Sequence, residues 1–80
     1  MKLLYQKEIT HRSMTVEYLL YQTKDGFTAE VKKREGENVE TASHPIGTDR
    51  KESLRLIRAL QKSRVTPYSL HEALADRYTE

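Results

Sequence analysis

The chain has 80 residues, no cysteine, 36% hydrophobic residues and a formal net charge of +2. This length suits one compact domain over residues 1–80, because a separate core needs about 50 residues or more. The lack of cysteine excludes disulfides, thiolate nucleophiles and cysteine-ligated zinc. We expect a thin hydrophobic core, since globular chains are usually about 45–50% apolar.

The sequence predicts no membrane association. No stretch approaches the roughly 18 consecutive apolar residues that span a bilayer. The opening segment MKLLYQKEI turns polar at Gln6, which makes its apolar run too short for the core of a signal peptide. We therefore expect a cytoplasmic location.

Two segments rich in apolar and β-branched residues predict the first pair of strands. The first covers about residues 2–10, and its alternation places Leu4 on the face opposite Tyr5 and Ile9. The second covers residues 14–23, where valine, threonine, tyrosine and leucine suit a pleated surface. The polar residues between them predict a connecting turn.

Turn signals divide the next part of the chain into two further strands. The Asp-Gly pair at residues 25–26 predicts a tight hairpin, because both turn residues must tolerate positive φ. Residues 27–33 alternate regularly and predict a third strand. After a turn at Gly36, a weaker run over residues 39–43 predicts a short edge strand. The order of these segments predicts an antiparallel meander of three or four strands.

Two helices are expected after the strands. Asp49, with Glu52 three residues later, predicts an N-cap and a capping box for a helix over about residues 50–63. Pro67 stops this helix and suits the first turn of a second helix over about residues 67–78. The cap of the second helix is either Thr66 or Ser69, which has Glu72 three residues later. The expected fold class is α+β, with an antiparallel sheet covered on one face by two carboxyl-terminal helices. The buried stripe of the second helix is expected to contain Leu70, Ala73, Leu74 and Tyr78.

Several short motifs, mostly near the carboxyl terminus, match a known pattern. They are Gly26-Phe27, Ile46 with Asp49, and a block made of Val65-Thr66-Pro67, Leu70, Glu72, Ala73, Leu74 and Asp76. Together they resemble a small uncharacterised protein family of spore-forming Gram-positive bacteria, catalogued as a domain of unknown function. The resemblance implies a bacterial protein with strands followed by helices, and it implies no activity, cofactor or catalytic residue. The ending Arg77-Tyr78-Thr79-Glu80 departs from the family's acidic tail.

Basic residues are concentrated in the first expected helix. Residues 50–64 contain six lysines and arginines but one acidic residue, Glu52. Four of the cations recur at helical spacing and form what we call the basic stripe: Lys51, Arg55, Arg58 and Lys62. Such a stripe is typical of a solvated helix face. Because it lacks interleaved acidic residues, it also favours nucleic-acid binding through phosphate contacts.

A second candidate surface lies on the sheet face that the helices leave uncovered. Alternation places Leu4, Leu19 and Tyr21 on this face. An exposed apolar strip is a common feature of interfaces. We therefore expect a non-enzymatic interaction module that binds an unknown protein partner or forms a homodimer through this face or the short edge strand. Nucleic-acid binding is the alternative. The sequence leaves both hypotheses open.

The sequence offers little for catalysis or metal binding. His11, His44 and His71 lack the spacing of a zinc site. No nucleophile elbow, glycine-rich phosphate loop or carboxylate pair on a rigid element is found in the sequence. We therefore expect that the protein is not an enzyme and that it needs neither a metal nor a cofactor.

Overall fold

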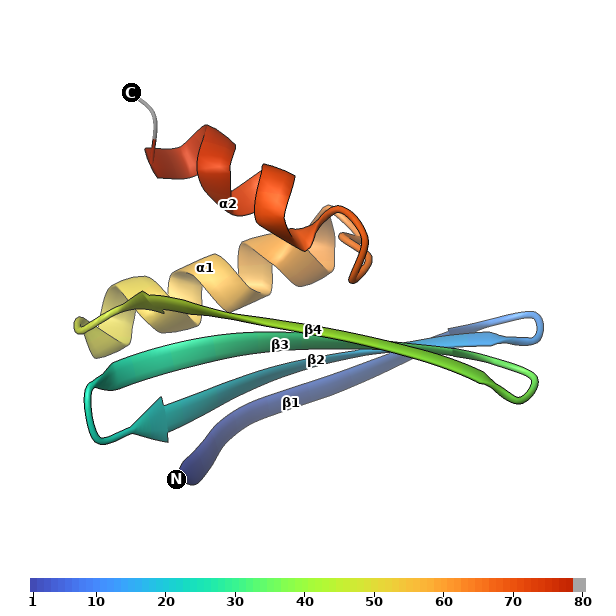
Figure 1. Ribbon diagram of the computed structural model, residues 1–80, viewed down its shortest axis with the longest axis horizontal. Coiled ribbons are helices and arrows are strands. Elements are labelled where there is room, and N and C mark those ends of the chain that lie inside the picture. The colour runs from blue at the N-terminus through green and yellow to red at the C-terminus, as the bar shows by residue number, and fades with distance from the viewer. Residues whose placement is uncertain (79–80) are drawn as a thin grey trace.

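The computed structural model describes the backbone of residues 1–78 and the side chains of residues 1–75. Its elements are β1 (Lys2–His11), β2 (Met14–Thr23), β3 (Gly26–Glu35), β4 (Asn38–Gly47), α1 (Arg50–Lys62) and α2 (Leu70–Tyr78). The strands form one antiparallel sheet in the order β1-β2-β3-β4, and both helices lie on the same side of it (Figure 1). The expected α+β class and meander are confirmed. The expected burial of Tyr78 falls outside the described side chains.

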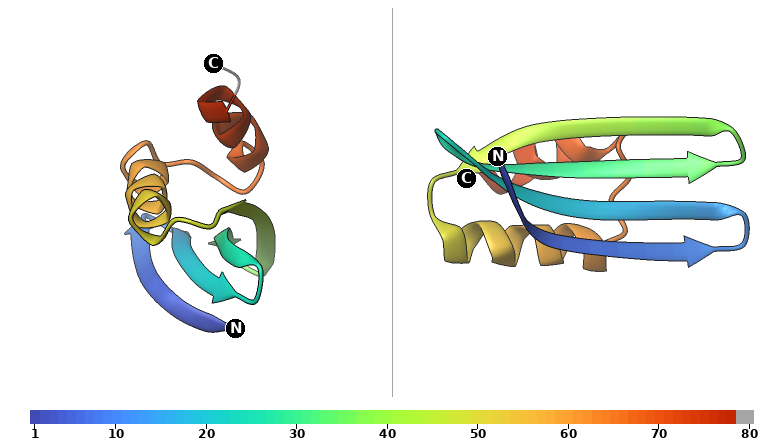
Figure 2. Two further views of the ribbon diagram at one scale, coloured as in Figure 1. Left: turned by 90° about the vertical axis from the view of Figure 1, so that its left-hand side faces the viewer. Right: turned by 90° about the horizontal axis from the view of Figure 1, so that it is seen from below.

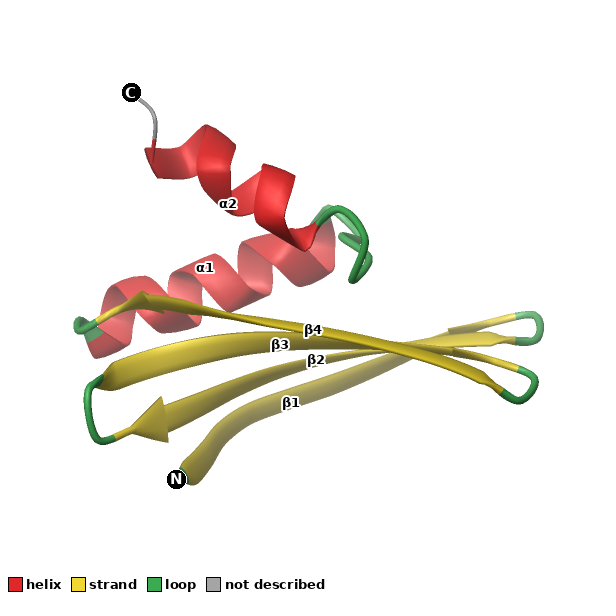
Figure 3. Cartoon of the chain, in the orientation of Figure 1, coloured by secondary structure: helices red, strands yellow, loops and turns green. Residues whose placement is uncertain are grey.

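The strands are long and their connections are short (Figure 3). β4 covers ten residues, so the prediction of a short strand over residues 39–43 was wrong. Its register with β3 runs from Asn38 opposite Glu35 to Gly47 opposite Phe27. Pro45 is accommodated because β4 is an edge strand, where a missing backbone N–H breaks no internal ladder.

α2 begins at Leu70, later than residue 67 but directly after Ser69, the second of the two expected caps. A turn precedes it, in which the backbone N–H of Ser69 donates to the carbonyl of Thr66 at 3.1 Å. The Ser69 hydroxyl accepts from the backbone N–H of Thr66, and the first α-helical bond runs from Ala73 to the Ser69 carbonyl. Pro67 therefore belongs to the turn before the helix.

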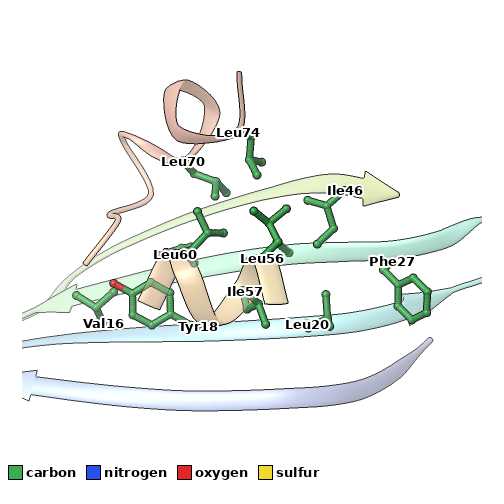
Figure 4. Packing of buried hydrophobic residues seen from close by; sticks show 12 residues of the cluster. Val16, Tyr18, Leu20, Phe27, Ile46, Leu56, Ile57, Leu60, Leu70 and Leu74 are labelled. Atoms are coloured by element: carbon green, nitrogen blue, oxygen red, sulfur yellow. The ribbon is translucent and has the colours of Figure 1, made fainter. Parts of the chain in front are cut away.

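The hydrophobic core lies between the helices and one face of the sheet, which we call the core face. α1 lies across β2 and β3, and α2 lies beside β4 (Figure 2). Side chains from both layers gather there, as Figure 4 shows for part of the cluster. The cluster contains Val16, Tyr18, Leu20, Phe27, Ala29, Val31, Ile46, Leu56, Ile57, Leu60, Leu70 and Leu74.

α1 is closed at both ends by local hydrogen bonds. At its start, the Asp49 carboxylate accepts from the backbone N–H of Glu52 at 3.0 Å, which confirms the predicted N-cap. At its end, the N–H of Val65 donates to the carbonyl of Leu60, and the N–H of Arg64 donates to that of Gln61. These two bonds form a Schellman motif, which stops the helix and turns the chain back over the sheet.

The Schellman motif places Arg64 in the left-handed region, at φ 56°. Glycine is the usual residue at this position, because a side chain there costs roughly 1–2 kcal/mol. The contact that usually accompanies the motif is present, since Val65 packs against the core cluster that contains Leu60. The helix end is thus well formed around a residue that does not favour its conformation.

A bulge in β1 changes which residues face the core. Leu3 pairs with Tyr21 and Tyr5 pairs with Leu20, so Leu4 is an extra residue in the strand. Leu4 packs against the core cluster, whereas Leu3 is 44% exposed. The prediction that Leu4 lies on the uncovered face was therefore wrong. It assumed strict alternation along β1, and the bulge interrupts that alternation.

Because of the bulge, Leu4 is partly buried while its neighbour Leu3 is exposed. We expect Leu4→Ala to lower the free energy of unfolding by about 1–3 kcal/mol, because it removes packing from a partly buried site. Leu3→Ala is the matched control and should cost under about 0.5 kcal/mol. Urea unfolding followed by circular dichroism measures both values. A larger loss for Leu3→Ala would contradict the register of β1.

Candidate functional site

The sheet face away from the helices, which we call the open face, is largely polar. Figure 2 shows that no helix lies over it. The strand register directs mainly hydroxyl and charged side chains to it: Thr10, Thr15, Glu17, Tyr21, Thr28, Glu30, Lys32 and Thr41. This composition differs from the apolar strip that the sequence predicts.

Leu19 points to the open face and is nevertheless only 3% exposed. It lies directly between Gln6 of β1 and Glu30 of β3. Gln6 also donates a hydrogen bond to the carboxylate of Glu17, which crosses the strand pair beside Leu19. Long polar side chains of the sheet itself therefore cover Leu19. Of the three residues predicted for this surface, only Tyr21 remains partly accessible there.

Tyr21 has an acidic environment. Desolvation raises the pKa of its hydroxyl, and the charge of Glu30, a hydrogen bond to Glu30 and the charge of Glu17 raise it further. A raised pKa in the folded state stabilises the fold below the unfolded value of about 10. This contribution is lost as the pH rises through the folded pKa.

Removing the charge of Glu30 should change this titration. We expect Glu30→Gln to lower the pKa of Tyr21, because the main charged partner of the phenolate is lost. Carbon NMR of labelled tyrosine rings follows the titration of each ring separately. Glu35→Gln removes the same charge near the far end of β3 and serves as the control. An unchanged Tyr21 pKa in Glu30→Gln would contradict the proposed coupling.

The basic stripe is assembled as the sequence predicts. Lys51, Arg55, Arg58 and Lys62 are all exposed, on the side of α1 opposite the buried Leu56 and Leu60. Three of the four, with the half-buried Leu54, line an open hollow of about 310 Å³. The stripe is therefore a continuous accessible surface on one rigid helix.

One acidic residue touches the stripe. Nη1 of Arg55 donates to Oε1 of Glu52 at 2.8 Å, one helical turn earlier. Both side chains are more than 60% exposed, so water and salt screen the pair and it contributes little to stability. Glu52 thus leaves most of the positive charge of the stripe free to act on a ligand.

Arg58 ties the stripe to the edge strand β1. Its guanidinium carbon lies 5.9 Å from the centre of the Tyr5 ring, within cation–π range. The Tyr5 hydroxyl in turn donates to Oε1 of Gln61. Lys7 follows on the same face of β1, opposite Tyr18, and adds an exposed cation beside α1. Sequence reasoning missed Lys7, although its alternation with Tyr5 predicts the shared face.

Metal sites and membrane-spanning helices are not found in the described part of the chain. Residues 1–75 contain no group of three or more histidine, aspartate or glutamate side chains that could hold a metal ion. His44 and His71 come close, with ring centroids 5.6 Å apart, but they form only a pair. Among the described residues, no helix is long and apolar enough to cross a membrane.

Comparison with known proteins gives no further information on function. Neither the protein-family models, nor the characterised proteins, nor the solved structures give a match to this chain. The resemblance to a family of spore-forming bacteria stays a prediction. Function is therefore argued from the chain's own charge and geometry.

Proposed function

We propose that the protein binds the phosphate backbone of nucleic acids through the exposed side of α1. The supporting observation is the basic stripe, in which four accessible cations share one face of a single helix. Phosphate contacts from lysine and arginine supply most of the affinity of non-specific nucleic-acid binding. The alternative suggested by the sequence thereby becomes the leading hypothesis, since Leu4 packs against the core and Leu19 is buried, so the predicted strip on the open face is not formed.

The dimensions of the stripe suit a nucleic-acid strand. At a rise of roughly 1.5 Å per residue, the distance along α1 from Lys51 to Lys62 is about 16 Å. Phosphates of one strand of duplex DNA rise by about 3.4 Å each along the axis, so the stripe is long enough for each of its four cations to reach a phosphate. Flexible cationic side chains position a backbone without reading bases, and we expect weak sequence preference.

The charge distribution directs a polyanion to α1. Residues 50–64 carry six basic residues and one acidic residue, while the whole chain has a net charge of only +2. The remaining residues are therefore net negative. Such asymmetry orients an approaching polyanion before contact.

Salt dependence gives a quantitative test. Four phosphate contacts should give a slope of about −3 to −4 when the logarithm of the duplex association constant is plotted against that of the salt concentration. The double variant Arg55→Gln/Arg58→Gln should weaken binding and reduce the slope by about 2. Fluorescence anisotropy of a labelled oligonucleotide measures both quantities.

The matched control is Lys24→Gln/Arg34→Gln, which removes the same charge from the β2–β3 turn and from β3. It should retain the slope of the original protein. Circular dichroism checks that both variants are folded. Equal loss in the two double variants would show that net charge alone governs binding, and an unchanged affinity in Arg55→Gln/Arg58→Gln would exclude the stripe.

A second candidate function is association with a protein partner or a second copy along the outer edge of β4. β4 is an edge strand, and Val39 near its start is 58% exposed. An exposed edge presents unpaired backbone groups to which another strand can be added. Of the two surfaces that the sequence offers for this interaction, the edge strand is favoured over the open face, where Leu19 is covered.

Light scattering after size-exclusion chromatography tests the self-association form of this candidate. We expect the mean mass to rise from low to high micromolar concentration, and Val39→Lys to suppress the rise, because an edge lysine opposes strand addition. Glu8→Lys adds the same residue on β1, away from β4, and is the control. A monomeric mass at every concentration would exclude the homodimer.

A further inference from the structure

A groove of about 220 Å³ lies on the core face, beyond the carboxyl-terminal end of α1. The hairpin that joins β1 to β2 extends past both helices at this end of the sheet (Figure 1). Ile9, Met14 and Val16 line the groove, together with Tyr18. Ile9 and Met14 are half-buried and pack against the core cluster. The groove therefore has an apolar floor that the helices leave open.

The rim of the groove is cationic and polar. Arg64 and Thr66 contribute from the connection between the helices, and His11 contributes from the end of β1. Burial raises the pKa of the Tyr18 hydroxyl, whereas the charge of Arg64 acts in the opposite direction, which brings that charge close to the groove. The Tyr18 hydroxyl itself donates to the Val65 carbonyl at 2.8 Å and is already satisfied. Arg64 is therefore the natural partner for an anionic group.

Backbone strain points to the same place. Among the described residues, two residues other than glycine have positive φ, Arg64 at 56° and Arg12 at 58°. Arg12 lies in the turn between His11 and Met14, which both line the groove. Both strained residues are thus arginines beside one groove. Strain at such positions is often retained for function, and at Arg64 it accompanies a cation at the rim of the groove.

We propose that the groove binds a small amphiphilic carboxylate. The apolar chain lies on Ile9, Met14 and Val16, and the carboxylate pairs with the Arg64 guanidinium, whose forked donors match a carboxylate. The volume lies below the roughly 300–1,000 Å³ of sites for drug-sized ligands, which limits the ligand to a short or medium chain. No residue of the basic stripe lines the groove, so this site is independent of the proposed nucleic-acid surface.

Octanoate is the probe, with acetate and octanol as controls. We expect octanoate to shift the amide and methyl NMR signals of Ile9, Met14, Val16 and residues 64–66. Acetate lacks the apolar chain and octanol lacks the charge, so each should bind at least about tenfold more weakly. Octanol binding as tightly as octanoate would overturn the carboxylate assignment. Shifts confined to the open face would overturn the site.

Arg64→Gly separates binding from folding. It removes the cation and relieves the left-handed strain, so we expect the melting temperature to rise by about 2–6 °C. The same variant should bind octanoate at least about tenfold more weakly. Arg34→Gln, on β3, is the control and should change neither value. Octanoate affinity that is unchanged in Arg64→Gly would exclude the proposed role of the arginine, and absent octanoate shifts in the original protein would exclude the site.

Discussion

The packing of α1 on β2 and β3 is the interaction on which the other features depend. Ile57 is fully buried between the helix and the sheet. Tyr18 fixes the far end through its hydrogen bond to the Val65 carbonyl, and the Asp49 cap fixes the start. This docking sets the rotation of α1 about its axis. The basic stripe faces outward for the same reason that Ile57 faces inward, and Arg64 is carried to the end of the β1–β2 hairpin.

The features that the sequence predicts well are local ones. The N-cap at Asp49 and the basic stripe depend on residues a few positions apart in one helix, so periodicity is sufficient to find them. The misplaced features depend on neighbouring strands. Leu4 turns toward the core because β1 contains an extra residue opposite β2, and β4 continues through Pro45 because β4 is an edge strand.

The exposed fraction of a strand side chain is harder to predict from sequence than the face of the sheet to which it points. Alternation places Leu19 on the correct face of the sheet, but it does not show that Gln6 and Glu30 lie on either side and help to cover it. The groove could not be predicted for a related reason. Its floor comes from β1 and β2, while Arg64 and Thr66 belong to a loop far along the chain. Only the packing of α1 brings these parts together.

The basic stripe and the groove with Arg64 differ in their conformational cost to the folded protein. The basic stripe lies on a solvated helix face, where lysine and arginine are good helix formers and do not destabilise the fold. Arg64 occupies a position that favours glycine, in a small domain where each kilocalorie is a sizeable part of the stability. A residue kept against its own conformational preference is the stronger indication of function. On this physical argument the groove, although smaller than the stripe, is the more informative of the two surfaces.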